Sequence, residues 1–259
     1  MTDKNQTLTQ ALANPTRFMA FSAWLLPIVA VLAAVVLAIA VYMGLNSPVD
    51  YQQGHTVKIM YLHVPAAWLA MGVYVAVAIS SFGLLVFRHP LADVSAKAAV
   101  PLGAAFTFIA LVTGSLWGKP MWGAYWVWDA RLTSVLLLFF LYLGLMALRS
   151  SIEDETEAAK LTAVLALVGV ALLPVIKFSV EWWNTLHQPS TRMTSTMHPS
   201  FRYPLLVHAL GFSLLFLAMH LKAMRNEILR RRVRALEMVA ANRPTSDAAV
   251  LAPRTEGAS

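Results

Sequence analysis

Residues 21–45 read FSAWLLPIVAVLAAVVLAIAVYMGL, and no charged side chain interrupts them. An α-helix rises about 1.5 Å per residue, so about 20 apolar residues cross the roughly 30 Å hydrocarbon core of a bilayer. A helix is the structure expected here, because it satisfies the backbone hydrogen bonds within the segment. The sequence therefore predicts a membrane-spanning helix at residues 21–45.

Five further stretches without Asp, Glu, Lys or Arg follow, at residues 64–87, 98–118, 132–148, 161–176 and 203–221. The last three are shorter, and we expect flanking Lys and Arg side chains to extend toward the lipid headgroups there. The composition agrees, since 58% of the 259 residues are hydrophobic and 13% are charged. No strand-like alternation of apolar and polar residues is evident. We therefore predict an all-α integral membrane protein with six transmembrane helices.

The Lys and Arg residues lie mainly on one side of this predicted bundle. With six spans both termini share a side, and the segments on that side carry 14 of the 20 Lys and Arg residues. The three loops on the other side, at residues 46–63, 117–131 and 177–202, carry the remaining six. Cytoplasmic loops are enriched in basic residues, so we predict that both termini are cytoplasmic and that these three loops face outward.

We divide the chain into a cytoplasmic tail at residues 1–20, a six-helix membrane domain at 21–224 and a second cytoplasmic tail at 225–259. The first helix is expected to be retained rather than cleaved as a signal peptide, because its apolar run is too long and its leader is polar. The second tail is basic and is expected to be partly disordered. Its run Arg230-Arg231-Arg232 follows a membrane helix and predicts contact with anionic lipids, not nucleic acid. The acidic turn Glu153-Asp154-Glu155 is interpreted as solvated.

The predicted outer loop at residues 117–131 concentrates tryptophan. It holds Trp117, Trp122, Trp126 and Trp128, which are half of the eight tryptophans in the chain. Single tryptophans at helix ends are common anchors at membrane interfaces, and we interpret the other four in that way. Four in one loop, together with two glycines and a proline, exceed what anchoring needs. The loop therefore predicts a broad apolar surface suited to a planar ligand.

Two histidines lie at predicted helix ends on the same outer face. His63 stands where the second predicted helix begins, and His187 follows the end of the fifth. Imidazole nitrogen is a good ligand for iron, zinc and copper. Two histidines from different helix ends, above the tryptophan-rich loop, suit the two faces of one haem iron. The sequence does not say whether His208, in the sixth predicted helix, approaches the same ligand.

A haem also needs cations for its propionates, and the candidates in the outer loops are Lys58, Arg131 and Arg192. Asp129 and Arg131 are in addition expected to shape the tryptophan-rich loop. The chain has no cysteine, which excludes a structural disulfide, a thiolate metal ligand and a covalently attached c-type haem. Any haem bound here is therefore expected to be held non-covalently.

Four motifs of this chain resemble those of known proteins. WGKPMWG at 117–123 and WVWDARLTS at 126–134 closely resemble the tryptophan-rich WWD signature of the haem-handling superfamily. YLHVP at 61–65 and WWNTLHQ at 182–188 are similar to motifs of the haem exporter protein C family, which acts in bacterial cytochrome c maturation. The resemblance covers about residues 18–225 and the six-span layout, with no departure at the signature positions.

This resemblance implies that the protein is not an enzyme but holds haem b on the periplasmic face of the bacterial inner membrane. Members present the haem to a membrane-anchored periplasmic haem chaperone during cytochrome c-type biogenesis. They act beside the ATPase and permease subunits of an ATP-binding-cassette transporter and a small single-span subunit. The residues that match the family's axial iron ligands are His63 and His187, and the stretch matching residues 117–129 contacts both haem and chaperone.

We expect the four tryptophans of the outer loop to cover the porphyrin while the two histidines clamp its iron. Trp122 and Trp126 are four residues apart and share a face if that stretch is helical. Trp117 and Trp128 then complete the wall. Because no thiol bonds the haem, its release requires only exchange of an axial ligand and loss of apolar contacts.

Two other functions remain open on the residues alone. An electron-transfer cytochrome b also binds haem through histidine pairs, but it places those pairs within the membrane. A small-molecule permease requires a polar path at mid-membrane, and the six apolar stretches contain no charged residue. Both alternatives therefore explain fewer features of the sequence than haem binding at one membrane face.

Overall fold

The computed structural model describes residues 14–183, 186–187 and 197–241, and helices account for most of them. The elements in chain order are α2 (Pro15–Leu45), the short 3₁₀ helix η1 (His55–Ile59), α3 (Met60–Phe87), α4 (Pro90–Trp122), α5 (Ala130–Ser151), α6 (Glu155–Gly169), α7 (Leu172–Trp182) and α8 (Pro199–Ala241). Within these residues the one β-type pairing is an isolated bridge between Asp50 and Gly54. The all-α fold class predicted from the sequence is therefore confirmed.

Six helical segments of the described residues are long and apolar enough to cross a membrane. α2, α4, α5 and α8 each form one such segment, η1 joins α3 in another, and α6 joins α7 in the last. Each segment contains one of the six uncharged stretches of the sequence, so their predicted number and positions are confirmed. α8 is the longest at 43 residues, and it continues without a break through the predicted domain boundary at 224–225.

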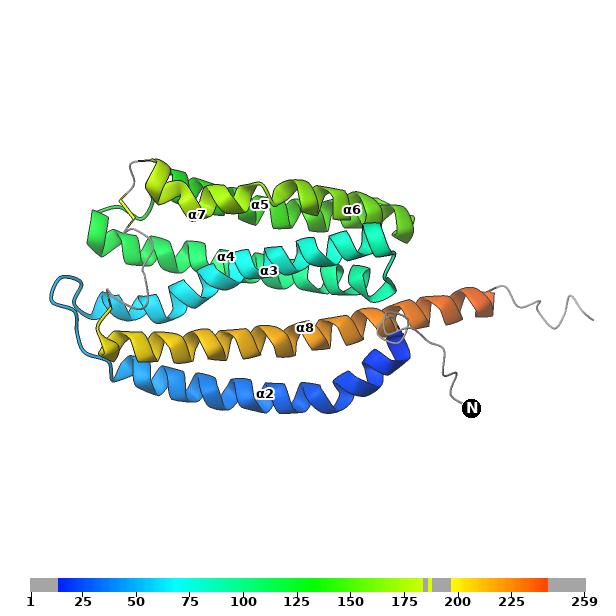
Figure 1. Ribbon diagram of the computed structural model, residues 1–259, viewed down its shortest axis with the longest axis horizontal. Coiled ribbons are helices and arrows are strands. Elements are labelled where there is room, and N and C mark those ends of the chain that lie inside the picture. Colours follow the sequence, from blue (N-terminus) through cyan, green and yellow to red (C-terminus); the bar gives the residue numbers. More distant parts are fainter. Residues whose placement is uncertain (1–13, 184–185, 188–196, 242–259) are drawn as a thin grey trace, which may run out of the picture.

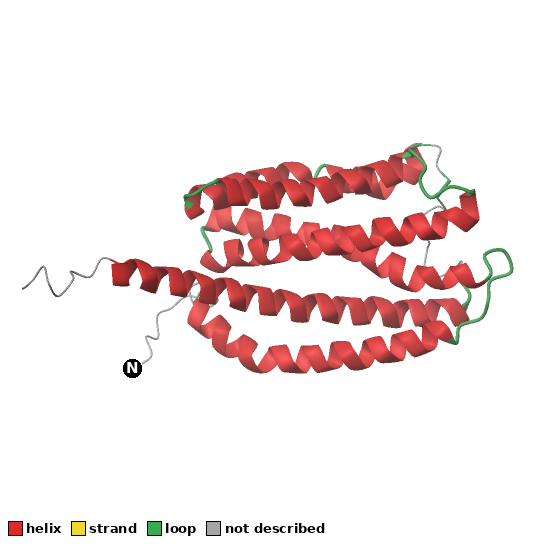
Figure 2. Ribbon diagram, turned by 180° about the vertical axis from the view of Figure 1, so that it is seen from behind, coloured by secondary structure: helices red, strands yellow, loops and turns green. Residues whose placement is uncertain are grey.

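The helices run side by side in three groups (Figure 1 and Figure 2). α2 packs along α8, α3 packs along α4, and α5 lies with α6 and α7 on the far side from α2. α8 also contacts α3 and α4, which joins the α2–α8 pair to the other helices. The start of α2 and the end of α8 lie at one end of the bundle, here called the terminal end. The opposite end carries Trp117 to Trp128 and is called the tryptophan end.

Two buried tyrosines join the central helices. The Tyr142 hydroxyl of α5 donates to the Ala70 carbonyl of α3 at 2.8 Å, and the Tyr74 hydroxyl of α3 donates to the Ala166 carbonyl of α6 at 3.0 Å. The two rings meet edge to face, with centroids 5.3 Å apart. Because a buried hydroxyl without a partner costs about 1–3 kcal/mol, these bonds favour one register of α3, α5 and α6.

The fifth span is interrupted, which the sequence analysis did not anticipate. α6 ends at Gly169 and α7 begins at Leu172. Pro174 has no backbone N–H, and in a continuous helix its ring would collide with the carbonyl of Val170. The chain instead forms a turn in which the Leu173 N–H donates to the Val170 carbonyl at 3.0 Å. α7 is thereby directed separately toward the tryptophan end (Figure 1).

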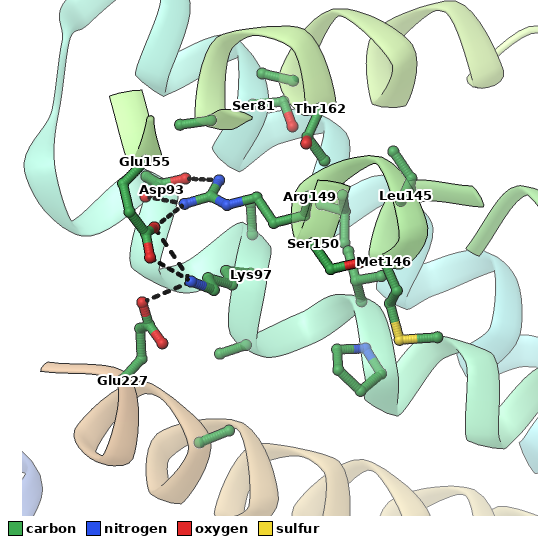
Figure 3. Close-up of a pocket in the computed structure, with 18 of the residues that line it drawn as sticks. Ser81, Asp93, Lys97, Leu145, Met146, Arg149, Ser150, Glu155, Thr162 and Glu227 are labelled. Carbon is green, nitrogen blue, oxygen red and sulfur yellow. Dashed lines mark hydrogen bonds and ion pairs between the residues drawn. The ribbon is translucent and has the colours of Figure 1, made fainter. Parts of the chain in front are cut away.

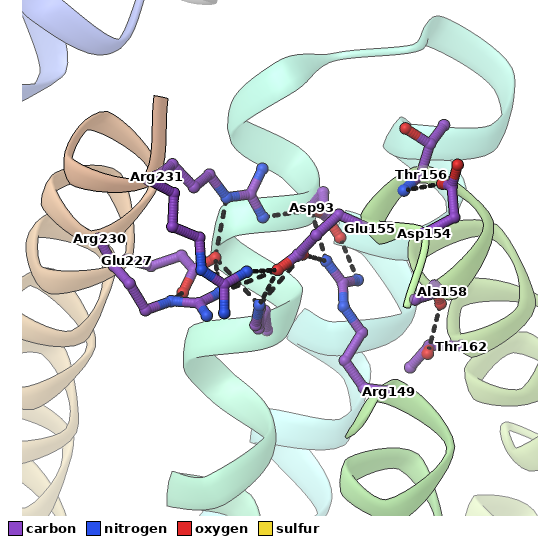
Figure 4. Close-up of polar contacts among 12 residues, drawn as sticks. Asp93, Arg149, Asp154, Glu155, Thr156, Ala158, Thr162, Glu227, Arg230 and Arg231 are labelled. Carbon is purple, nitrogen blue, oxygen red and sulfur yellow. Dashed lines mark hydrogen bonds and ion pairs between the residues drawn. The ribbon is translucent and has the colours of Figure 1, made fainter. Parts of the chain in front are cut away.

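An ion-pair cluster joins α4, α5, α6 and α8 at the terminal end (Figure 3 and Figure 4). Arg149 of α5 donates to Asp93 of α4 at 2.6 Å and to Glu155 of α6 at 3.2 Å. Lys97 of α4 lies 3.3 Å from Glu155 and 3.1 Å from Glu227 of α8. Three arginines of α8 extend the cluster: Arg230, Arg231 and Arg234. The interpretation of the acidic turn as solvated is therefore wrong for Glu155, which is a central member of this cluster.

The packing of α4 on α5 predicts opposite effects for two Gly→Ala substitutions. A Cβ added at Gly103 of α4 would overlap the Tyr142 ring, whereas one added at Gly144 of α5 meets nothing within 4 Å. We predict that Gly103→Ala lowers the free energy of unfolding by about 1–3 kcal/mol through overpacking. Gly144→Ala is expected to leave it unchanged or raise it by up to about 1 kcal/mol. Thermal unfolding in detergent measures both, and equal stability of the two variants would contradict this packing.

Candidate functional site

The candidate site lies at the tryptophan end, where the start of α3, the end of α4 and the start of α5 meet. Of the residues singled out in the sequence, the structure places five in two groups of contacts at this end: His63 with Trp117, and His187 with Trp122 and Asp129. They come from segments far apart in the chain. The site therefore depends on the packing of the helices rather than on one local motif.

His63 lies in the first turns of α3 and faces α4. Its Nδ1 is 3.0 Å from the Ala110 carbonyl oxygen and 3.1 Å from the Thr113 hydroxyl. A carbonyl only accepts hydrogen bonds, so Nδ1 carries the proton and the neutral ring keeps its lone pair on Nε2. Gly114 permits this close approach, because a Cβ there would lie 2.8 Å from the imidazole Cε1. His63 is thus oriented as a ligand that binds through Nε2.

His187 is also in the tautomer that carries the proton on Nδ1, but its hydrogen-bond partner is different. Its Nδ1 is 3.0 Å from Oδ2 of Asp129, which is buried. The other carboxylate oxygen of Asp129 accepts the Leu132 N–H at 2.8 Å and caps the start of α5. Carboxylates commonly orient metal-binding histidines in this way, leaving the Nε2 lone pair for the metal. One side chain therefore both begins α5 and orients His187.

The His187 imidazole is held in its neutral form near pH 7. Burial lowers the pKa of His187 below the ordinary histidine value of 6.5, and this effect outweighs the hydrogen bond and charge of Asp129, which raise it. The positive charge of Arg131 lowers the pKa of His187 further. A neutral imidazole is the form that ligates metals, so the protonation state of His187 at neutral pH is compatible with that role.

The two histidines lie at the same end of the bundle. His187 and Arg131 both act electrostatically on His63, and Arg131 also acts on His187. Each also has one tryptophan at its edge. The Trp117 ring centroid is 5.7 Å from that of His63 at 71°, and the Trp122 centroid is 4.8 Å from that of His187 at 62°. Each candidate ligand is therefore flanked by an indole from the end of α4.

The expectation that Trp122 and Trp126 share a helix face is wrong. α4 continues through Trp122, and Gly123 then ends it with a left-handed φ of 76°, a conformation that glycine adopts readily. Trp126 and Trp128 follow in the short connection to α5. Their rings are in contact, with centroids 5.4 Å apart. The predicted loop at 117–131 is thus helical in its first half, with Trp117 and Trp122 on α4 and with Trp126 and Trp128 in the connection to α5.

The four tryptophans differ in exposure and in polar partners. The Trp117 indole N–H donates to Oε1 of Gln53 at 2.9 Å. The Trp126 Nε1 is buried and has no hydrogen-bond partner among the described residues. Trp128 is 76% exposed and offers its ring to a partner outside the chain. Trp126 therefore presents an N–H donor that suits an added acceptor oxygen.

Two of the basic side chains suggested as partners of the haem propionates form hydrogen bonds near helix ends. The Lys58 ammonium group donates to the Leu45 carbonyl at 2.6 Å. It thereby gives a hydrogen-bond partner to the last carbonyl of α2. Arg131 lies 3.3 Å from the Ser179 hydroxyl and from the Lys177 carbonyl, and it holds α7 against α5. Arg192 lies outside the described residues. Gln53, Ala110 and Thr113 are contacts that the sequence analysis missed, and no sequence signal distinguishes them.

His208 belongs to the packing between helices rather than to the paired histidines. It is 6% exposed, its Nδ1 lies 2.8 Å from the Pro204 carbonyl, and its ring stacks on Tyr61 at 5.0 Å. Tyr61 and His63 are two residues apart on α3, which directs their side chains to nearly opposite sides of the helix. The Tyr61–His208 stack therefore lies on the side of α3 away from the one that His63 faces.

Two imidazoles flanked by indoles suit a metal that brings further ligands with it. Within the described residues, no group of three or more His, Cys, Asp or Glu side chains is arranged to hold a bare metal ion. A metalloporphyrin supplies four nitrogen ligands of its own and needs two axial ligands, apolar contacts and hydrogen-bond donors. The paired histidines, the tryptophans and the unpartnered Trp126 N–H fit these requirements.

The fold and the site define a multi-pass helical membrane protein with a histidine- and tryptophan-lined site at one end. The sequence model of the family described as "Heme exporter protein C" matches residues 8–239, which is most of the chain. The protein therefore belongs to the haem exporter protein C family, and the resemblance to this family is confirmed. Members of this family are haem-handling membrane proteins rather than enzymes.

Relatives from several bacteria agree over nearly the whole length. Heme exporter protein C of Bradyrhizobium diazoefficiens is 62% identical over 235 residues, covering 90% of this chain and 89% of the relative. The protein of the same name from Escherichia coli K12 is 49% identical over 225 residues, covering 86% and 91%. That of Paracoccus denitrificans is 46% identical over 232 residues, covering 86% and 95%.

The Asp129–His187 contact predicts how the His187 imidazole titrates. In the ligand-free protein its midpoint is expected below 6.5, because burial disfavours the imidazolium. Asp129→Asn preserves the helix cap but removes the charge that raises the pKa, so the midpoint should fall further. Asp154→Asn is the control, because it makes the same change at the cap of α6. This variant should leave the titration midpoint of His187 unchanged. Histidine NMR measures this, and a midpoint that rises in Asp129→Asn would contradict the assigned contact.

Proposed function

We propose that this protein binds haem b non-covalently between His63 and His187 and delivers it to a periplasmic haem chaperone during cytochrome c-type biogenesis. The observation that carries the proposal is the matched orientation of the two imidazoles. Each directs its Nδ1–H to a protein oxygen and so keeps the lone pair on Nε2. Membership of the haem exporter protein C family supports haem as the ligand.

The tryptophans are proposed to supply the apolar contacts of the porphyrin. Trp117 and Trp122 flank the two histidines and offer indole rings beside the iron ligands. The buried Trp126 N–H is available to a propionate oxygen. The exposed Trp128 ring is proposed as a contact for the chaperone, because a partner that takes haem from this site must approach its edge.

The charged residues of the site are proposed to have different roles. Arg131 acts electrostatically on both histidines, so it is well placed to offset the negative propionates. Lys58 is a weaker candidate for that role, since its ammonium group already satisfies the end of α2. Asp129 is proposed to act through His187, whose orientation and basicity it sets.

Haem transfer requires that one axial ligand be exchanged for a ligand of the chaperone. We propose that His187 is the one replaced. It lies beyond the end of α7 and its side chain is 20% exposed, whereas His63 belongs to α3 and bonds to the backbone of α4. The chain has no cysteine, so no covalent bond to the haem has to be broken.

The site is proposed to face the periplasm, with the terminal end in the cytoplasm of a bacterium. Basic residues concentrate at the terminal end, as the positive-inside rule requires. The proposed partners in the inner membrane are the ATPase and permease subunits of an ATP-binding-cassette transporter and a small single-span subunit. The basic run of α8 is proposed to contact anionic lipids there.

Removal of either candidate ligand should abolish stable haem binding. We predict a six-coordinate low-spin haem spectrum in the purified wild type and roughly tenfold or greater loss of haem in His63→Ala and in His187→Ala. His55→Ala is the control, because His55 is exposed in η1 at the same end of the bundle. Haem content is measured by absorption. Unchanged haem in both ligand variants would refute the proposed site.

Asp129 should matter for haem through its charge rather than through its capping role. We predict that Asp129→Asn weakens haem affinity by about 10–100-fold, as loss of a carboxylate that orients a metal-bound histidine commonly does. Asn is as good a cap as Asp, so α5 should remain intact. Asp154→Asn provides the matched control at the other end. Haem titration followed by absorption tests this, and equal affinities of the two variants would exclude a positioning role.

A further inference from the structure

A pocket of about 770 Å³ lies at the terminal end, and Figure 3 shows its lining. The two candidate histidines are at the opposite end of the bundle. Residues of α3, α4, α5, α6 and α8 line it, together with the turn between α5 and α6. This volume is in the range of pockets that hold organic ligands. None of the lining residues is a histidine, so the pocket does not repeat the candidate haem site.

The pocket is amphiphilic. In Figure 3 the side chains of Leu145 and Met146 lie on one side of it, and those of Glu155, Asp93 and Glu227 lie on the other. Apolar residues of α4, Val100, Pro101 and Leu102, add to its apolar lining. The membrane-spanning helices end at this level, so the polar part is at the depth of lipid headgroups and the apolar part is at the depth of acyl chains.

The charges in the lining balance in sign, and most of them are already paired. Four acidic and four basic side chains line the pocket: Asp93, Glu153, Glu155, Glu227, Lys97, Arg149, Arg230 and Arg234. Seven of these take part in the ion-pair cluster. Glu153 is exposed and has no ion pair among the described residues. The lining therefore offers one acidic group for a cation.

One hydrogen-bond donor among the lining residues also has no partner. The Nη groups of Arg149 bond to Asp93 and Glu155, but its Nε–H is buried and has no partner among the described residues. A buried N–H of a guanidinium without an acceptor is costly, and phosphate oxygens are good acceptors for it. Arg149 is therefore the candidate contact for an anion, and Glu153 is the candidate contact for a cation.

We propose that this pocket binds a zwitterionic phospholipid whose headgroup carries a primary ammonium, such as phosphatidylethanolamine. The phosphate accepts the Arg149 Nε–H, the ammonium pairs with Glu153, and an acyl chain lies along Met146. A purely anionic lipid would leave Glu153 beside an added negative charge. Free phosphate would leave the apolar part empty, and a metalloporphyrin would find no imidazole among the lining residues.

Lipid retention by the full-length, haem-free chain tests this proposal. The protein is reconstituted in nanodiscs of equal phosphatidylethanolamine and phosphatidylglycerol, extracted in mild detergent, and its retained lipids are counted by native mass spectrometry. The wild type should retain phosphatidylethanolamine in preference to phosphatidylglycerol. Glu153→Gln should reduce that preference roughly threefold, the scale of one exposed ion pair. Glu157→Gln, an exposed neighbour that does not line the pocket, should leave it unchanged.

A second variant tests the apolar part. Met146→Trp places a larger side chain in the pocket and should reduce total retained lipid by roughly fivefold or more while the protein remains monodisperse. The proposal is overturned if the wild type retains phosphatidylglycerol equally well. It is also overturned if inorganic phosphate displaces the lipid, or if Glu153→Gln and Glu157→Gln behave alike. Because no haem is present, these outcomes are independent of the proposed haem site.

Discussion

The arrangement of the candidate site depends on the hydrogen bonds that the Asp129 carboxylate accepts from two described residues, Leu132 and His187. One comes from the Leu132 N–H and starts α5, and the other comes from Nδ1 of His187. A helix cap contributes about 1 kcal/mol, and a hydrogen bond to a charged group contributes about 1.5–3 kcal/mol. Because one side chain makes both, His187 is tied to the start of α5.

The two histidines are oriented alike but held differently. His63 bonds to a backbone carbonyl of α4 inside the packed helices, and His187 bonds to a carboxylate at the edge of the bundle. In the proposed site the carboxylate would make His187 the more basic ligand, and its place beyond α7, with the side chain 20% exposed, would leave it within reach of a partner. The proposed holding and release of haem would then use one fixed ligand and one that a partner can reach.

The membrane spans and the candidate histidines were predictable, because hydrophobicity and motif identity are local properties of a sequence. The six spans follow from uncharged stretches, and His63 and His187 follow from their place beside helix ends and aromatic residues. The contacts that orient these histidines were not predictable, since Asp129 and His187 are 58 residues apart and any backbone carbonyl could have met His63. The end of α4 at Gly123 was missed because glycine and proline in that run suggested a loop from Trp117 onward.

Coordination of one haem iron by both imidazoles can be read from electron paramagnetic resonance of the ferric haem-bound protein, with its histidines labelled with ¹⁵N. The proposed site predicts a low-spin signal with hyperfine coupling to two axial imidazole nitrogens. The haem that remains bound in His187→Ala should lose one of these couplings. A high-spin signal in the wild type, or a low-spin signal that keeps both couplings in His187→Ala, would contradict binding between His63 and His187.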